Sequence, residues 1–339
     1  MSGTSLDGLD IAYVEFIKKE KWHYLLGPCQ TIKYTEEWLE KLHSLSEKST
    51  SYISKVDQDF GAFIGTCVND FIKANQVDVD LICSHGHTVF HQPEINYTLQ
   101  IGSGKAIAKK SKKIVVCDFR SLDVSLNGQG APLVPLGDML LFANYTYCLN
   151  LGGFSNVSYQ KETERKAFDI CPVNIVLNKL AQKLGIPFDE DGEIAKKGVL
   201  IKTLFEQLNQ LNYYQLKGPK SLGKEWVEEF IDPLLRGESS IQNLLHTFTE
   251  HAAYQIGKKL QNGSCLVTGG GAYNKHLINR IQQYTNCELH LPDNQTIEYK
   301  EALVFGLLGV LKYRNEVNCL RSVTGAVKDS CSGLLFTPD

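Results

Sequence analysis

The stretch Thr146–Asn178, TYCLNLGGFSNVSYQKETERKAFDICPVNIVLN, decides the fold of this chain. It opens with an apolar run, Tyr147–Leu151, that predicts a buried strand. The pair Gly152-Gly153 follows at once, and glycines after a strand let the backbone approach a ligand closely. A second short strand leads to Asp169, and a helix is expected from Asn174. This alternation of strands and helices predicts an α/β protein.

Asp169 is the main candidate for a reactive group in this stretch. It stands at the end of the run Lys166–Phe168, and α/β proteins place reactive side chains at strand ends, beside loops and helix starts. We therefore predict that Asp169 is a general base next to a bound nucleotide and a sugar. The alternative is that it is a strand-end carboxylate that caps the next helix.

Two further glycine-rich turns accompany strands elsewhere in the chain. MSGTSLDG (1–8) precedes the alternating run 9–16, and GGGAYN (269–274) follows the apolar run 265–268. Backbone N–H groups at such turns bind phosphate well, so three turns spread over two lobes predict a nucleotide clamped between them. For any one turn the alternative is that its glycines merely allow a tight bend. Neither a P-loop nor a dinucleotide-binding glycine motif is present.

The first turn raises a question about the start of the fold. A turn such as MSGTSLDG is expected between two strands, so a strand should also precede it. Two explanations stay open: the chain lacks its first strand, or the start codon was placed late. The N-terminus has neither the basic nor the apolar region of a signal peptide.

Composition is that of an ordinary globular protein with two sizeable cores. The 339 residues are 43% hydrophobic and 22% charged, with a net charge of -3. A net charge this small gives no overall electrostatic attraction to nucleic acid or a membrane surface. No apolar run reaches the roughly 18 residues of a membrane span. None of the ten cysteines has metal-ligand spacing, which favours buried reduced thiols in a cytoplasmic protein. Glycine and proline breaks in 118–138 place the lobe boundary there.

Three other patterns have a structural interpretation that we favour. The lysine cluster 105–113 is typical of a solvated helix face. The acidic segment 188–198 lacks the calcium-loop pattern, so we predict that it is solvated. His85, His87 and His91 resemble a metal triad, but their segment has no acidic partner. We expect them to be a polar wall or satisfied core histidines.

Ten segments in order carry a resemblance to a known family. They are MSGTSLDGLD (1–10), SHGHTVFHQP (84–93), LQIGSG (99–104), DFRSLDVSLNGQGAPLVP (118–135), LNLGGFSN (149–156), FDICPVN (168–174), GPKSLGKEW (218–226), VTGGGAYN (267–274), EALVFG (301–306) and SVTGA (322–326). Together they resemble the anhydro-N-acetylmuramic acid kinase family, within the actin, Hsp70 and sugar-kinase superfamily. The match spans nearly the whole chain.

The resemblance implies a two-lobed actin-like (ribonuclease H-like) α/β fold, with a mixed sheet flanked by helices in each lobe and ATP in the cleft between them. It assigns 1–131 and about 316–339 to the N-terminal lobe, and 132–315 to the C-terminal lobe. It implies an ATP- and Mg²⁺-dependent kinase that opens the 1,6-anhydro bond of a muramic acid sugar and phosphorylates O6. The product, N-acetylmuramic acid 6-phosphate, belongs to peptidoglycan recycling. A homodimer is also implied.

The family motifs suggest roles for individual residues. Asp169 matches the catalytic base, and Asp7 is a candidate for the magnesium shell that could instead cap its turn. Arg120, Asn174 and Glu301 are candidates for the sugar. For Arg120 the alternative is a salt bridge to Asp118 or Asp123, and for Glu301 a charge at a helix N-terminus. The nucleotide-binding candidates are Gly3, Thr4, Ser5, Leu6, Asp7, Gly8, Leu9, Asp10, Gly152, Gly153, Asn156, Gly269, Gly270, Gly271 and Asn274.

One motif departs from the family pattern. Where the family usually has FDTGPGN, this chain has FDICPVN, with Ile170, Cys171 and Val173 in place of a threonine and two glycines. If those glycines needed positive φ, Val173 would cost about 1 kcal/mol or more. Two alternatives to the kinase therefore stay open: a related kinase of another sugar, and a non-catalytic ATP-binding regulatory protein of the same fold.

Overall fold

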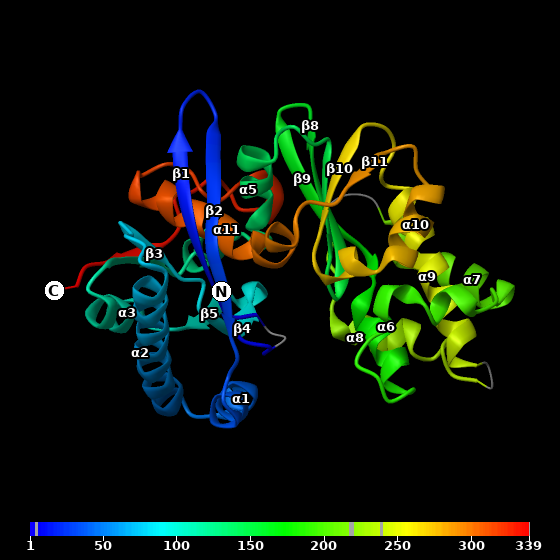
Figure 1. The fold of residues 1–339 in the computed structure, drawn as a ribbon, viewed down its shortest axis with the longest axis horizontal. Coiled ribbons are helices and arrows are strands. Elements are labelled where there is room, and N and C mark those ends of the chain that lie inside the picture. The colour runs from blue at the N-terminus through cyan, green and yellow to red at the C-terminus, as the bar shows by residue number, and fades with distance from the viewer. Residues whose placement is uncertain (4–5, 217–219, 238–239, 339) are drawn as a thin grey trace. The chain divides into compact units, whose positions relative to one another are not determined.

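The computed structural model describes residues 1–3, 6–216, 220–237 and 240–338 and consists of two compact units (Figure 1). The first comprises Met1–Leu141 and Tyr299–Asp339, and the second Phe142–Glu298. Each is α/β with a mixed sheet, as predicted. Residues 132–141 and 299–315, which we expected in the second lobe, belong to the first unit. The reason is a shared core, because Leu136 packs in one apolar cluster with Val304 and Phe305.

The first unit contains a three-stranded sheet and two strand pairs. The sheet has the order β12-β6-β3, with β3 parallel and β12 antiparallel to β6. The pairs β1-β2 and β4-β5 are antiparallel. The elements are β1 Leu9–Lys18, β2 Trp22–Ile32, α1 Glu36–His43, α2 Thr50–Asn75, β3 Leu81–Cys83, β4 His87–Gln92, β5 Tyr97–Ile101, α3 Gly104–Ser111, β6 Ile114–Cys117, α4 Ser121–Ser125, α5 Val134–Leu141, α12 Arg321–Thr324 and β12 Leu334–Phe336. Helix α11, Asn294–Tyr313, belongs to this unit from Tyr299 onward.

The second unit is built on a five-stranded sheet of order β11-β10-β7-β8-β9. Its first three strands are parallel, and β8 and β9 continue the sheet antiparallel. The elements are β7 Tyr147–Leu151, β8 Phe154–Lys161, β9 Glu164–Pro172, α6 Asn174–Gln182, α7 Lys202–Asn209, α8 Lys224–Trp226, α9 Ile241–Gly257, β10 Ser264–Thr268, α10 Lys275–Gln283 and β11 Glu288–His290. No helix among the described residues has the length and apolar character needed to span a bilayer.

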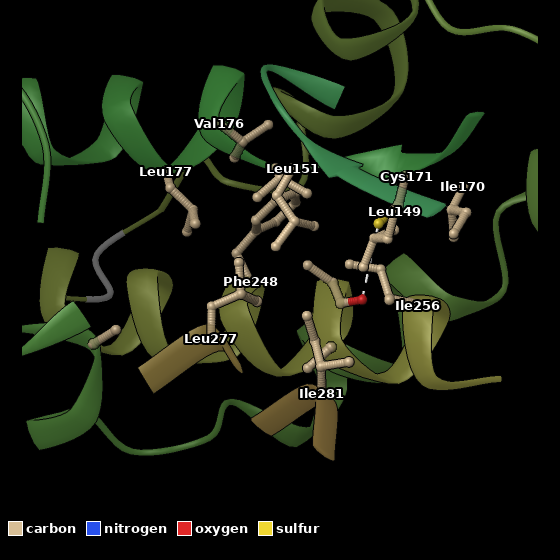
Figure 2. Close-up of a cluster of buried hydrophobic side chains, with 14 of the residues drawn as sticks. Leu149, Leu151, Ile170, Cys171, Val176, Leu177, Phe248, Ile256, Leu277 and Ile281 are labelled. Atoms are coloured by element: carbon tan, nitrogen blue, oxygen red, sulfur yellow. Dashed lines mark hydrogen bonds between the residues drawn. The ribbon is translucent and has the colours of Figure 1, made fainter. Parts of the chain in front are cut away.

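The core of the second unit joins its sheet to three helices. Figure 2 shows Leu149 and Leu151 of β7 near side chains of α6, α9 and α10. These positions follow the periods of the sequence, because strands buried by helices are apolar throughout and helices present one apolar stripe. Phe248 of α9 is fully buried among them. The core therefore fixes the position of β7, which carries the glycine pair at its end.

Phe248→Ala is expected to lower the free energy of unfolding of this unit by about 3–5 kcal/mol, because it removes a fully buried aromatic side chain and leaves a cavity. Native-state hydrogen exchange of the α9 amides measures the change. The matched control is Phe188→Ala, since Phe188 is 54% exposed and its truncation should stay within about 0.5 kcal/mol of wild type. Equal effects of the two substitutions would contradict the assignment of Phe248 to the core.

Two local expectations are wrong. In the run 224–235, apolar residues recur at the spacing of one amphipathic helix, but the structure forms α8 and a π-helical turn, Val227–Ile231. Pro233 has no N–H to continue a regular helix. The acidic segment 188–198, predicted as solvated, buries Asp189, whose carboxylate accepts hydrogen bonds from the N–H groups of Ile194 (2.9 Å) and Ala195 (2.8 Å).

Candidate active site

Two glycine turns of the second unit meet at one end of its sheet. Strands β7 and β10 are parallel neighbours, with Asn150 opposite Thr268 in the last paired position. The turn Gly152-Gly153 follows β7, and the turn Gly269–Gly271 follows β10. The carboxyl ends of parallel strands are where α/β sheets bind ligands. The similarity of these two segments in the sequence therefore corresponds to closeness in space.

The glycine turn after β10 requires glycine at two of its positions. Gly269 has φ +83°, and a Cβ there would lie 2.5 Å from the Asn150 Oδ1 atom. A Cβ on Gly271 would lie 2.8 Å from the Leu151 Cβ atom. At Gly270, by contrast, the nearest atom to an added Cβ is the Asn174 Nδ2 atom at 3.8 Å. The turn is therefore packed against the end of β7 and leaves Gly270 open.

Gly269→Ala is expected to lower the free energy of unfolding by about 1–3 kcal/mol, because alanine is strained at this φ and its Cβ meets Asn150. Gly270→Ala is the control, since it adds the same methyl group without a clash and should stay within about 0.5 kcal/mol of wild type. Urea unfolding measures both. If the two variants were equally stable, the turn would not have the close packing described here.

The three asparagine candidates lie around these turns in different ways. Asn174, the first residue of α6, donates from its Nδ2 atom to the carbonyl oxygen of Leu151 at 3.2 Å. Asn156 is exposed on β8 and lies opposite Asp169 of β9 in the strand register. Asn274 caps α10, because its Oδ1 atom accepts the N–H of Leu277 at 2.9 Å. The structure thus brings Asn174 to both glycine turns and gives Asn274 a helix-capping contact.

Asp169 is held on both sides of its backbone and at its carboxylate. It lies within β9, the edge strand, and not at the strand end as expected. Its N–H donates to the carbonyl of Lys220 (2.9 Å), and its own carbonyl accepts the hydroxyl of Tyr213 (2.7 Å). Its Oδ2 atom accepts the N–H of Leu222 at 2.8 Å. Tyr213, Lys220 and Leu222 therefore line the outer edge of β9 at Asp169.

The environment of Asp169 favours its protonated form. The side chain is half-buried, and burial raises the pKa of its carboxyl above the ordinary value, while the Leu222 N–H lowers the pKa by a smaller amount. A raised pKa makes a carboxylate a stronger proton acceptor near neutral pH. The helix-cap alternative has no support, because the N-cap of α6 is Val173 and the Asp169 carboxylate accepts the Leu222 N–H.

Lys220 is a residue at this site that the sequence interpretation left without a role. Its Nζ atom donates to the carbonyl of Tyr213 at 2.8 Å and lies 4.1 Å from the centre of the Tyr213 ring. Burial lowers the pKa of the Lys220 ammonium to about 8, with the charge of Lys259 acting in the same direction. The motif GPKSLGKEW was the available signal, but nothing in it indicates contact with Asp169.

The three substitutions in FDICPVN lie in the core. Ile170, Cys171 and Val173 are 1%, 0% and 0% exposed and belong to the apolar cluster of the second unit. Val173 has φ -133°, so the anticipated strain from positive φ is absent. Their added bulk therefore fills the interior, and the possibility of another sugar loses its main support.

The first glycine turn is described in part. Thr4 and Ser5 lie outside the described residues, and Leu6 donates its N–H to the carbonyl of Gly3 at 3.3 Å. Gly8 packs so closely on β2 that a Cβ would lie 2.7 Å from the carbonyl oxygen of Ile32. Asp7 is exposed, whereas the Leu9 side chain is in the core. Asp10 accepts a hydrogen bond from the hydroxyl of Thr31 at 2.5 Å.

Arg120 is oriented by a neutral histidine. Its Nε atom donates to the Nε2 atom of His85 at 3.0 Å, and one terminal nitrogen donates to the carbonyl of Gly130 at 2.7 Å. Burial lowers the pKa of His85 well below its ordinary value, and the charge of Arg120 lowers it further. Arg120 makes its hydrogen bonds to His85 and Gly130 and not to Asp118, and Asp123 instead accepts the Gly130 N–H. The guanidinium is therefore held by neutral groups.

Glu301 is exposed on α11, in the same unit as Arg120. The helix begins at Asn294, so Glu301 is beyond the first turn, and the proposed interaction with the helix N-terminus is wrong. Loss of hydration raises the pKa of the Glu301 carboxyl above its ordinary value, and the charges of Arg120 and the Met1 amino group oppose that rise. The other histidines have neutral partners, His87 contacting Ser2 and His91 contacting Thr98, each at 3.1 Å. Among the described residues no three His, Cys, Asp or Glu side chains gather as metal ligands.

At this end of the sheet, glycine turns follow β7 and β10, and the half-buried carboxylate of Asp169 lies on β9. This arrangement is typical of α/β proteins that bind a phosphate-bearing ligand. The model of the anhydro-N-acetylmuramic acid kinase family matches residues 1–338. The chain therefore belongs to that family.

Individual relatives agree with this assignment. Proteins named anhydro-N-acetylmuramic acid kinase from Hydrogenovibrio crunogenus and Bacillus cereus are 32% and 30% identical, covering all of this chain and 97% and 98% of theirs. The protein of that name from Shewanella frigidimarina is 33% identical over 99% of this chain and 96% of its own. A solved structure of the activator of 2-hydroxyisocaproyl-CoA dehydratase from Clostridium difficile, with bound ADPNP, is 15% identical with a TM-score of 0.33, covering 50% of this chain and 67% of that one. That similarity is too low to support an argument.

Proposed function

We propose that this chain is an ATP-dependent kinase that hydrolytically opens 1,6-anhydro-N-acetylmuramic acid and phosphorylates O6, giving N-acetylmuramic acid 6-phosphate. Membership of the family supports the substrate and the reaction. The single observation that carries the mechanism is the position of Asp169, held by the Leu222 N–H with its pKa raised by burial. The product would enter peptidoglycan recycling and amino-sugar catabolism.

Asp169 would act as the general base of the reaction. Its carboxylate takes a proton from water, and the water oxygen forms a bond to the anomeric carbon of the sugar. The bond from that carbon to O6 breaks, and O6 attacks the γ-phosphorus of ATP as ADP leaves. The electron pair released at O6 thus forms the new O–P bond, and the proton on Asp169 returns to solvent. One base therefore serves hydrolysis and phosphoryl transfer together.

The glycine turns are the proposed ATP contacts. Gly152, Gly153 and the turn 269–271 would present backbone N–H groups to phosphate oxygens, as glycine turns and helix starts do in other nucleotide sites. Gly270 is exposed, which leaves room for such an approach. Residues 3–10, with Asn156 and Asn274, would complete the nucleotide contacts. Mg²⁺ bound with ATP would supply positive charge to the phosphate oxygens, and Asp7 is the residue we assign to it.

Arg120, Asn174 and Glu301 are the proposed sugar contacts. The guanidinium of Arg120 is held by neutral groups, so its charge can pair with the lactyl carboxylate of the sugar. Asn174 and Glu301 would bind hydroxyl or amide groups of the same molecule. The ten free cysteines support a reducing compartment, and we place the protein in the cytoplasm. We also propose that it forms a homodimer, as the family resemblance implies.

A substrate panel tests the proposed function directly. Purified protein is incubated with ATP, Mg²⁺ and one sugar at a time, and ADP release is followed. Rapid ADP release with 1,6-anhydro-N-acetylmuramic acid is the expected result. ADP release with other anhydro sugars, but not with this one, would support a related kinase. ATP binding without turnover on any sugar would support a regulatory protein of the same fold.

A further inference from the structure

His85 and Arg120 follow two neighbouring parallel strands of the first unit. Strand β3 pairs with β6 in the parallel direction, with Cys83 opposite Val116. His85 comes shortly after β3, which ends at Cys83, and Arg120 comes shortly after β6, which ends at Cys117. The carboxyl ends of parallel strands meet at one end of a sheet. The fold therefore brings together two residues that are 35 positions apart in the sequence.

The backbone that presents His85 depends on the glycine after it. Gly86 has φ +73°, and a Cβ at this position would collide with the carbonyl oxygen of Ile101. Glycine is the residue that fits where φ is positive and another backbone lies this close. The His85 side chain itself is 7% exposed, and its ring meets the ring of Phe305 edge-on, with the centroids 4.7 Å apart. The imidazole is therefore held in one position.

The hydrogen bonds of His85 determine which of its ring nitrogens carries the proton. A guanidinium can only donate hydrogen bonds. The Nε atom (3.0 Å) and the Nη2 atom (2.8 Å) of Arg120 both contact the His85 Nε2 atom, so that nitrogen is the acceptor. The proton of the neutral ring is then on Nδ1, which donates to the carbonyl of Gly86 at 3.1 Å. His85 thus contacts Arg120 without bringing any charge.

The contact with His85 occupies only part of the Arg120 guanidinium. The group carries five N–H donors. Two of them point to His85, and a third, on Nη1, donates to the carbonyl of Gly130 at 2.7 Å. Within the part of the chain that the structure describes, no hydrogen bond uses the other two, one on each terminal nitrogen. Two such donors suit the two oxygens of a carboxylate.

The groups that hold Arg120 leave its positive charge largely unbalanced. They are an imidazole, a backbone carbonyl and the ring of Phe305, whose centroid is 5.9 Å from the guanidinium carbon. Burial lowers the pKa of the Arg120 guanidinium, and the charge of Glu301 opposes that change. A carboxylate in place of the imidazole would form a two-pronged ion pair with Arg120. The choice of a neutral residue at position 85 therefore decides whether Arg120 can still take an anion.

We propose that His85 is a specificity-determining positioning residue that fixes one edge of the Arg120 guanidinium and keeps its charge available for a carboxylate of the substrate. The role rests on the proposed function, because the carboxylate in question is the lactyl group of the anhydro sugar. His85 acts through Arg120 and does not touch the reacting atoms. It is the residue that makes the first unit favour an acidic anhydro sugar over a neutral one.

Two substitutions of nearly equal size test this role. His85→Gln keeps a neutral oxygen that can accept from Arg120, whereas His85→Glu places a carboxylate there. Calorimetry without ATP measures the affinities for 1,6-anhydro-N-acetylmuramic acid and 1,6-anhydro-N-acetylglucosamine. The ratio of the two affinities should stay within about threefold of wild type for His85→Gln. For His85→Glu it should fall about 30-fold or more, because the new carboxylate occupies Arg120 and repels that of the sugar.

Two further measurements do not depend on the folding of His85→Glu. Nitrogen-15 NMR of wild type at neutral pH should show the His85 ring with a proton on Nδ1 and none on Nε2. His85→Leu removes the acceptor and leaves Arg120 without its orientation. Its affinity for the acidic sugar should fall about tenfold or more, while its affinity for the neutral sugar should change much less.

Several results would overturn the proposal. Equal falls of the affinity ratio in the glutamine and glutamate variants would show that His85 only supports the fold. An unchanged ratio in His85→Glu, equal losses of both affinities in His85→Leu, or protons on both ring nitrogens of wild type would show that a neutral acceptor is not what Arg120 requires. Absence of turnover by wild type, with the expected binding ratios, would contradict the proposed kinase and still support the role of His85.

Discussion

Asp169→Asn is expected to reduce kcat by about 10³-fold or more while leaving ATP and sugar binding close to wild type. The amide has nearly the shape of the carboxylate and can still accept the Leu222 N–H, but it cannot take a proton from water. Steady-state ADP release measures kcat, and calorimetry with each ligand measures binding. Asp191→Asn is a suitable control, because Asp191 is a carboxylate of the same unit that pairs with Lys275 at the surface.

Retention of more than about a tenth of the wild-type rate by Asp169→Asn would remove Asp169 from the role of base. Loss of nucleotide binding together with turnover would instead indicate a structural defect. Either result contradicts the expectation, and the Asp191 variant shows whether loss of any carboxylate in this unit has the same effect.

The pH profile gives a second check on the same group. Burial raises the pKa of Asp169, so kcat/KM should fall tenfold per pH unit below that raised value, as the base becomes protonated. The same raised pKa also predicts how the substitution Asp169→Asn changes stability. A raised pKa in the folded state means that ionisation opposes folding, so Asp169→Asn should be more stable than wild type at neutral pH. That difference should disappear as the pH falls below the unfolded value of about 3.9.

Arg120→Ala is expected to lower kcat/KM for 1,6-anhydro-N-acetylmuramic acid by about 10²-fold or more, because removal of one partner of a buried charge pair costs about 2–5 kcal/mol. The same substitution should change kcat/KM much less for 1,6-anhydro-N-acetylglucosamine, which lacks the lactyl carboxylate. Arg120→Lys keeps the charge but loses the two-pronged geometry, so its effect should lie between those of wild type and alanine. Initial rates with both sugars give the comparison.

A structural role for Arg120 would give a different result. Arg120 also bonds to His85 and Gly130, so its removal will lower the thermal midpoint to some extent. Equal losses of kcat/KM with the two sugars would show that Arg120 only supports the fold of the first unit. A loss confined to the sugar with the carboxylate would support direct recognition.

Local patterns in the sequence predicted those parts of the fold that depend on local physics. Apolar residues at 53, 56, 60, 63, 64, 67 and 68 recur at the spacing of one buried helix face, and α2 does run from Thr50 to Asn75. The similarity of the two strand-and-glycine segments indicated turns that bind one ligand, and the pairing of β7 with β10 does place them together. Apolar periodicity and glycine conformation are properties of neighbouring residues, so they are visible in the sequence.

Contacts between distant residues were not predicted. The Leu222 N–H and the Asp169 carboxylate are 53 positions apart, and a backbone donor has no signature in residue type. Asp189 was expected to be solvated because it is acidic, yet two backbone N–H groups satisfy it in the interior. Ile170, Cys171 and Val173 suggested an altered substrate site, but all three side chains are buried in the apolar cluster of the second unit.

The hydrogen bond from Leu222 to Asp169 has a consequence for how this position can vary. The donor is the backbone N–H of residue 222, so almost any amino acid at this position would supply it. Natural variation at 222 would therefore leave this hydrogen bond unchanged. Proline is the exception, because its ring replaces the hydrogen. A survey that scores importance by side-chain identity would therefore miss a contact made by the carboxylate that we propose as the general base.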